Sequence, residues 1–346
     1  MKYLVTGGAG YFGSALINRL LINKRNKVIS YDLNKSHIKN HNFISVLGDI
    51  RDQKKLSKYL NSVDVVFHNV AQVPIAKDKD LFWSVNRDGT KKLLESCLQN
   101  KVKKLIYTSS SAVFGIPKKN PVTNSTIPIP SEDYGKAKLA GERLCFEYKK
   151  KGLNCSIIRP RTILGTGRLG IFQILFEWVY QGKNIPVIDN GENIYQFIHA
   201  DDLAEASIKL SKLDKDYVIN VGAESFGSMR ETLEALISHA KTKSKIRSLP
   251  LYFTEKAMNL SSSLGLSPLG PYHALMYGRS LYFETNQTFK ILGFKPHYDN
   301  KSMIIESYDW YVKNRNTILN LGSKNASLHQ SPLKQRILKL IPYFLL

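Results

Sequence analysis

The sequence is poor in cysteine and has no long apolar run. Its 346 residues include only three cysteines, Cys97, Cys145 and Cys155, whose spacing fits neither a disulfide framework nor a metal site. Each stands in an apolar pattern, so we expect three buried thiols and no bound metal. No apolar run approaches the ~20 residues that a membrane-spanning helix requires. The chain starts directly with a strand pattern, so we expect no signal peptide, and a reducing cytoplasm fits these features.

Acidic residues are also scarce, because 28 Asp and Glu face 50 Lys and Arg, which gives a formal net charge of +22. The excess lies in lysine-rich runs that we interpret as solvated faces, with a specific polyanionic partner as the alternative. No nucleic-acid-binding module accompanies these runs, so we predict no nucleic-acid partner. A positive field still attracts an anionic small molecule.

The first 32 residues carry the most informative pattern. An apolar strand over residues 1–6 leads into a glycine-rich turn, a helical pattern and a second strand that ends on Asp32. This order is typical of the βαβ unit that binds dinucleotides. Gly7 permits the tight turn, Gly10 lets backbone N–H groups approach a pyrophosphate, and Gly13 lets the helix pack against the strand. The helix N-terminus then faces the phosphates.

Asp32 indicates which dinucleotide binds. A carboxylate at the end of the second strand accepts hydrogen bonds from the adenosine ribose and repels a 2′-phosphate. Lys35 is close enough in sequence to weaken that repulsion. We therefore predict NAD rather than NADP.

Short apolar strands continue to alternate with helical segments as far as Pro160, which predicts a doubly wound parallel α/β sheet of the Rossmann type. The pattern then loosens, as expected for a smaller C-terminal substrate-binding lobe with a return to the sheet near 216–221. We predict a NAD-binding domain over 1–160, a substrate-binding lobe over 161–316 and a tail over 317–346. Expected strands are 42–46, 63–68, 103–108 and 155–159, and expected helices are 53–60, 81–99 and 132–150.

The predicted tail is basic and apolar. From Lys313 onward the chain has six cations and no acid, with apolar residues at helical spacing near its end. Such a segment can lie at a membrane surface. Docking on its own domain or on a partner subunit, for example in a homodimer, is the alternative.

Two clusters of polar residues are candidates for chemistry. Tyr134 and Lys138 are four apart and share a helix face. An ammonium near a phenol favours the phenolate, so Tyr134 is a candidate base for a substrate alcohol. Ser110 and Ser111 follow a predicted strand at the sheet edge where ligands bind. They are candidates for holding the reacting oxygen.

These motifs together resemble the extended short-chain dehydrogenase/reductase superfamily, in its NAD-dependent epimerase/dehydratase branch. The resemblance implies that Tyr134 is the general base or acid, that Lys138 holds the nicotinamide ribose and lowers the pKa of Tyr134, and that Ser110 binds the substrate oxygen. The matching segments are 6–13 with Asp32, 48–52, 68–71, 85–90, 158–160, 165–168, 197–204 and 292–296.

The resemblance also implies which residues bind each ligand. The implied contacts of NAD, besides Tyr134 and Lys138, are Gly7, Gly10, Tyr11, Phe12, Gly13, Asp32, Asp49, Ile50, Val70, Ala71, Asn86, Thr108 and Pro160. The implied substrate contacts are Ser111, Arg161, Thr162, Arg168 and Gln196.

The sequence departs from its relatives at several of these places. Dehydratases carry an Asp-Glu pair where this chain has Ser111 and Ala112, so we expect no elimination of water. Thr162 stands where many sugar-nucleotide enzymes have asparagine, and Tyr195 and Gln196 stand where an arginine often binds phosphates.

We predict an NAD-dependent epimerase, or an allied oxidoreductase, that acts on a nucleotide-linked sugar through a keto intermediate. The alternative is an oxidoreductase of the 3β-hydroxysteroid dehydrogenase type with a lipid or other hydrophobic substrate. A third class, a dinucleotide-sensing regulator without turnover, conflicts with the intact Ser110, Tyr134 and Lys138 set.

Overall fold

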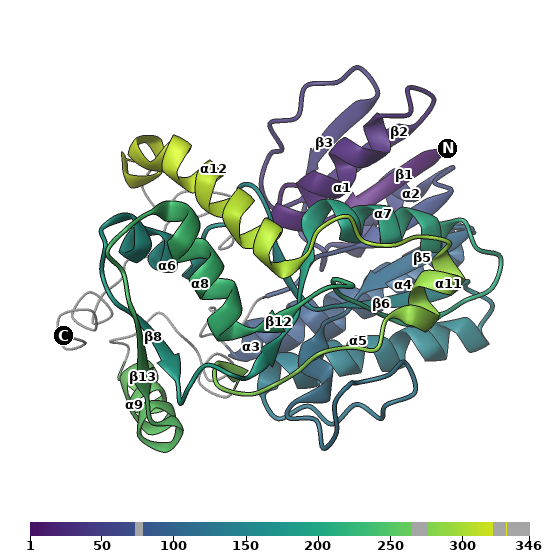
Figure 1. Ribbon diagram of the computed structural model, residues 1–346. Coiled ribbons are helices and arrows are strands. Elements are labelled where there is room, and N and C mark those ends of the chain that lie inside the picture. Colours follow the sequence, from purple (N-terminus) through teal and green to yellow (C-terminus); the bar gives the residue numbers. More distant parts are fainter. Residues whose placement is uncertain (73–78, 265–275, 321–329, 331–346) are drawn as a thin grey trace.

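A seven-stranded parallel sheet forms the centre of the computed structural model, which describes residues 1–72, 79–264, 276–320 and 330 (Figure 1). Every neighbouring pair in this sheet is parallel. Its strands are β1 (Lys2–Thr6), β2 (Lys27–Asp32), β3 (Phe43–Leu47), β4 (Val65–His68), β5 (Lys104–Thr108), β6 (Cys155–Pro160) and β11 (Val218–Val221).

The strand order is β11-β6-β5-β4-β1-β2-β3. The order therefore reverses between β1 and β4, and the carboxyl ends of these two strands form the place where doubly wound sheets bind ligands. The predicted Rossmann fold is confirmed. The return strand predicted near 216–221 is also confirmed, because β11 pairs with β6.

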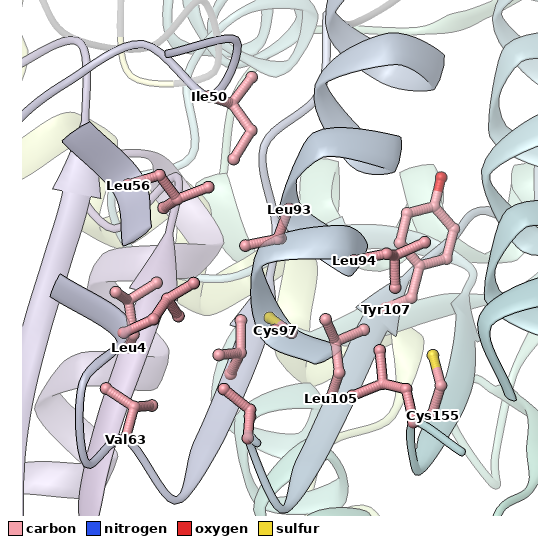
Figure 2. Packing of buried hydrophobic residues seen from close by; sticks show 14 of the residues in the cluster. Leu4, Ile50, Leu56, Val63, Leu93, Leu94, Cys97, Leu105, Tyr107 and Cys155 are labelled. Atoms are coloured by element: carbon pink, nitrogen blue, oxygen red, sulfur yellow. The ribbon is translucent and has the colours of Figure 1, made fainter. Parts of the chain in front are cut away.

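Helices cover both faces of the sheet. One face carries α1 (Tyr11–Leu21) and α7 (Ala200–Ser211), and the other carries α2 (Gln53–Leu60), α4 (Thr90–Gln99) and α5 (Asp133–Lys150). Consecutive side chains of β1 point to opposite faces of the sheet. Leu4 therefore packs with α2 and α4, while Tyr3 and Val5 pack with α1. Figure 2 shows the layer that contains Leu4 and Cys97. All three cysteines are buried, as predicted.

The C-terminal lobe lies beside the carboxyl end of the sheet (Figure 1). Its separate hydrophobic core is built mainly by three helices, α6 (Ile171–Tyr180), α8 (Met229–Ala240) and α12 (Asn300–Asn320). Helices α9 (Leu251–Ser263) and α11 (Asn286–Leu292) follow α8 in the chain. The strands outside the main sheet pair as β7 (Thr162–Leu164) with β10 (Phe197–His199), β8 (Ile185–Ile188) with β13 (Ile246–Leu249), and β9 (Ile194–Tyr195) with β12 (Gly227–Ser228).

The structure differs from the sequence prediction in two elements. The helix expected over 81–99 consists of α3 (Lys79–Trp83), a π-helical segment (Ser84–Gly89) and α4. Helix α12 continues past residue 317 to Asn320, and Ile318 is buried in the lobe, so the first residues of the predicted tail belong to this helix. The rest of the predicted tail lies outside the described residues, apart from Gln330. In the described part, no helix is long and apolar enough to cross a membrane.

Candidate active site

A cavity of about 610 Å³ opens along the carboxyl ends of the central strands. It extends from Asp32, at the end of β2, to Ser110 and Tyr134 beside β5. Most of the residues that the sequence assigns to ligands line it. They are Gly7, Gly10, Tyr11, Phe12, Gly13, Asp32, Asp49, Ile50, Val70, Ala71, Thr108, Ser110, Ser111, Tyr134, Lys138, Pro160, Arg161, Thr162 and Arg168.

The glycine turn is shaped so that only glycine fits. Gly7 has a φ of +69°, which L-residues with side chains rarely adopt, and a Cβ on Gly13 would lie 2.0 Å from the carbonyl oxygen of Gly7. Gly10 precedes α1 and provides no side-chain cap for it. The first N–H groups of α1 are therefore positioned for an anionic ligand. This cradle fits the pyrophosphate of a dinucleotide.

Asp32 and Asp49 lie at the adenosine end of the cavity. The backbone N–H groups of Ala9 and Asn34 donate to Asp32, while its burial raises the pKa of the carboxyl group. Arg51 donates from its guanidinium to Asp49 and holds the pKa of that carboxyl group below its usual value. Asp49 is thus fixed by a neighbouring cation, whereas Asp32 combines partial burial with access to the ligand.

The resemblance implies that Asn86 touches the cofactor, but this residue is not among those that line the cavity. Its side chain accepts from the backbone N–H of Gln72 at 2.8 Å and donates to the carbonyl of Gln72 at 3.1 Å. Asn86 is buried and does not line the cavity, whereas Gln72 does. Its side chain therefore positions the segment that follows β4 and acts on the site indirectly.

Tyr134 and Ser110 meet at the other end of the cavity. The side chain of Glu132 caps α5 by accepting from the backbone N–H groups of Tyr134 and Gly135 at 2.8 and 2.7 Å. This cap fixes the first turn, so the phenol of Tyr134 projects to the end of β5, where it forms a hydrogen bond with the side chain of Ser110. The hydroxyl pair that the sequence predicts is therefore assembled.

Lys138 lies on the same face of α5, one turn further. Its Nζ donates to the carbonyl of Thr108 at 2.6 Å and lies 4.6 Å from the ring centre of Tyr107. Burial lowers the pKa of Lys138 to about 8. The ammonium is thus held at the end of β5, on the wall of the cavity.

The resemblance implies that Lys138 lowers the pKa of Tyr134, whereas the groups that act against the rise of this pKa in the structure are Ser110 and Arg168. Burial raises the pKa of Tyr134 to about 12, and this rise is opposed by the hydrogen bond from Ser110 and by the charge of Arg168. Arg168 approaches from the C-terminal lobe, so its proximity to Tyr134 depends on how the two parts of the chain pack. This contribution was missed because no local pattern links the two residues.

Arg161 and Arg168 both line the cavity and are buried. Nη1 of Arg161 donates to Oγ of Ser111 at 2.8 Å, and its guanidinium lies 4.8 Å from the ring centre of Tyr195. Arg168 lies 5.4 Å from the ring centre of Tyr11. Burial lowers the pKa of Arg168 to about 10. The substrate end of the cavity therefore combines two buried cations with aromatic rings.

Gln196, also predicted as a substrate contact, is not among the residues that line the cavity. Its side chain is fully buried, donates to the carbonyl of Ala223 at 2.7 Å and accepts from the backbone N–H of Phe283 at 2.9 Å. Tyr195, its neighbour, lines the cavity instead, and its hydroxyl lies 2.8 Å from that of Thr162. Consecutive side chains of an extended segment point to opposite sides, so only one of the two faces the ligand.

Comparison with known proteins places this architecture in a family. Residues 3–222 match the family model described as "NAD dependent epimerase/dehydratase family", so the chain belongs to this family. It is an NAD-dependent enzyme of the extended short-chain dehydrogenase/reductase type.

The chain is similar to three proteins of different description. It is 50% identical to the uncharacterized protein y4nG of Sinorhizobium fredii, over 99% of this chain and 86% of that protein. It is 30% identical to the sterol-4-alpha-carboxylate 3-dehydrogenase, decarboxylating, of Mus musculus, over 60% of this chain and 58% of that protein. A solved structure of UDP-glucuronic acid 4-epimerase from Bacillus cereus in complex with NAD has a TM-score of 0.75 and 25% identity, covering 90% of this chain and 99% of the other.

Proposed function

We propose that the enzyme is an NAD-dependent epimerase, or a closely allied oxidoreductase, acting on a nucleotide-linked sugar. The observation that carries this proposal is the Ser110–Tyr134 hydroxyl pair in one cavity with two buried arginines. The pair suits proton transfer to and from an alcohol, and the arginines suit an anionic substrate. Similarity to the Bacillus cereus UDP-glucuronic acid 4-epimerase extends through both parts of the chain and supports the same proposal.

Each residue of the site has its own role in the proposed reaction. Ser110 holds the substrate oxygen, and Tyr134 takes the proton of the alcohol and returns it. Bound NAD supplies a hydride acceptor beside these residues. Lys138, held by Thr108, contacts the nicotinamide ribose and so fixes the reacting end. Ser111 and Ala112 have no carboxyl group for eliminating water, so the sugar keeps its hydroxyl groups.

The alternative function is oxidation of a sterol-like alcohol. Its support is the similarity to the Mus musculus sterol-4-alpha-carboxylate dehydrogenase, which is limited to 213 aligned residues. Aromatic rings at the substrate end, from Tyr11 and Tyr195, suit an apolar ring system. In this reaction the cofactor leaves in its reduced form.

The fate of the cofactor separates the two functions. The enzyme is incubated with NAD and UDP-glucose, UDP-glucuronic acid or a hydroxysteroid, and NADH absorbance and the configuration of the sugar are followed. An epimerase converts the sugar without net NADH, because the hydride returns to the substrate. NADH formed in proportion to an oxidised hydroxysteroid, with no binding of either nucleotide sugar, overturns the proposal. A Tyr134→Phe variant controls for contaminating activities.

We further propose that the enzyme acts in the cytoplasm, as a homodimer. Residues 321–346 would then contact a membrane surface or the partner subunit. The support for this contact is the basic and apolar composition of the segment, which contains cations and no acid.

A further inference from the structure

Arg161 has an unused hydrogen-bonding edge. Its side chain is 2% exposed, and Nη1 is occupied by Ser111. Nε and Nη2 are buried and have no hydrogen-bond partner. These two nitrogens form the edge of a guanidinium that donates two parallel hydrogen bonds to a carboxylate.

Arg159, two residues earlier, shows what this edge does when a partner is present. Its Nε and Nη2 donate to the two carboxylate oxygens of Glu142 at 2.8 and 2.6 Å. Both arginines are buried to a similar degree. Arg159 is thus satisfied by a carboxylate of the chain itself, whereas Arg161 presents the same edge without one.

The surroundings of Arg161 provide no compensating negative charge. Within the described ranges, no carboxylate lies at ion-pair distance from Arg161 or from Arg168. Instead, the guanidinium of Arg161 lies 4.8 and 5.9 Å from the ring centres of Tyr195 and Phe283. Arg168 also has a buried Nε without a partner. Burial of two cations without a neighbouring acid lowers the stability of the folded chain, and binding of an anionic ligand offsets this loss.

The place of Arg161 defines where the anionic group sits on the substrate. Ser111, which Arg161 binds, follows Ser110 directly in the chain, and Ser110 is hydrogen-bonded to Tyr134. Arg161, which lines the cavity with these residues, therefore lies close to the group that handles the reacting oxygen. An anionic group bound by Arg161 would therefore lie near the reacting carbon rather than at the far end of the substrate.

We propose that Arg161 binds a substrate carboxylate carried next to the carbinol carbon that reacts, so that the substrate is a β-hydroxy acid. This inference deepens the proposed function, since it narrows the nucleotide-linked sugar to a uronic acid. The same chemistry occurs on a sterol that carries a carboxylate beside its hydroxyl group. Arg161 then determines specificity, while Tyr134 and Ser110 act on the hydroxyl group.

The test compares ligands that differ only at the carboxylate. Dissociation constants are measured by calorimetry, in the presence of NAD, for UDP-glucuronic acid against UDP-glucose. A second pair, a sterol-4α-carboxylate and the matching 4α-methyl sterol, examines the other source of the carboxylate. We expect the acid to bind at least ten-fold more tightly than its neutral partner in one of these pairs.

Variants assign this preference to Arg161. Arg161→Gln should remove the preference for the acid while leaving the affinity for the neutral partner and for NAD within a few-fold. Arg161→Lys keeps the charge but not the two parallel donors, so it should restore only part of the preference. Arg143→Met removes an exposed arginine of α5 and should leave both affinities unchanged. The thermal melting curve and NAD affinity of each variant report whether it is folded.

The outcomes separate this inference from the proposed function. Equal affinity of the wild-type enzyme for acid and neutral partner in both pairs overturns the inference, and it requires no variant. Epimerisation of UDP-glucose without preference for the acid leaves the proposed function intact while this inference fails. A preference for the acid that is confined to the sterol pair supports this inference and contradicts the proposed action on a nucleotide-linked sugar. A preference that persists in Arg161→Gln also overturns the role of Arg161.

Discussion

The backbone N–H of Ala9 donates to Oδ2 of Asp32 at 3.1 Å. This bond joins the carboxylate at the end of β2 to the glycine turn after β1, so the two cofactor-binding features form one surface. The bond therefore connects the selectivity for the cofactor to the geometry of the turn.

Cofactor selectivity is the first prediction. NAD should bind at least several-fold more tightly than NADP, because Asp32 repels a 2′-phosphate. Asp32→Asn keeps an acceptor for Ala9 but removes the charge, so it should reduce the difference. Dissociation constants from fluorescence titration measure both. Lys35→Met is the control, and NADP affinity that depends on Lys35 rather than on Asp32 would contradict the assignment.

The second prediction concerns proton transfer. Tyr134→Phe removes the phenol but keeps the ring, so turnover should fall by roughly 10²–10⁴-fold. NAD affinity should change little, because the glycine turn and Asp32 hold the dinucleotide. Single-turnover kinetics and NAD titration report the two quantities. A variant with a near-normal rate would show that another group is the base.

Arg168 gives the third prediction, on pH dependence. Its positive charge lowers the pKa of Tyr134, which burial raises to about 12. In Arg168→Met this pKa should rise further, because an opposite charge is lost. The rising limb of the kcat profile for alcohol oxidation, along which Tyr134 loses its proton, should therefore move to higher pH.

The separation of kcat from KM is essential to this test, because Arg168 also lines the substrate end of the cavity. Loss of binding alone raises KM and leaves the kcat profile in place. The matched control is Arg143→Met, which removes an exposed arginine and should reproduce the wild-type profile. An unshifted kcat profile in Arg168→Met would contradict the electrostatic role.

The fourth prediction concerns stability in acid. His68 is fully buried between the hydroxyls of Thr6 and Thr90, at 2.7 and 2.9 Å. The Thr90 hydroxyl donates to the carbonyl of Asn86 at 2.8 Å, so it accepts from Nε2–H of His68. Burial lowers the pKa of His68 to about 3.

The unfolded chain binds a proton at His68 below about pH 6.5, whereas the folded chain does not until about pH 3. The free energy of unfolding should therefore fall as pH decreases through this window, by about 1.4 kcal/mol per unit from this group. His68→Gln should be less stable at pH 7, and its deficit should shrink toward pH 4. Denaturant titrations at several pH values measure this, and a constant deficit would contradict it.

Removal of residues 321–346 is the fifth prediction. Helix α12 ends at Asn320, so truncation after this residue preserves the helix that completes the core of the C-terminal lobe. NAD affinity should stay unchanged. Sedimentation with anionic vesicles and the oligomeric state in solution should differ between the two forms. Identical behaviour in both assays would contradict a role for this segment in association.

The order of elements and the cofactor cradle could be predicted from the sequence because their determinants are local. Gly7, Gly10 and Gly13 act within one turn, and Asp32 ends the very next strand. Tyr134 and Lys138 share a helix face by their spacing alone. Helix α2 begins and ends where its pattern predicts. The break in the helix expected over 81–99 was not visible, because the π-helical segment Ser84–Gly89 contains no proline and its Val85 lies four residues after Leu81, as in a continuous helix.

The tertiary structure decided which polar residues face the ligand. Tyr195 and Gln196 are neighbours, and only the packing of Gln196 against Ala223 and Phe283 shows that Tyr195 lines the cavity. Arg159 and Arg161 look equivalent in sequence, yet Glu142 reaches only one of them. A burial pattern fixes which face of an element is covered, but the partner of a buried charge comes from elsewhere in the chain. That pairing exists only once the helices and strands have packed together.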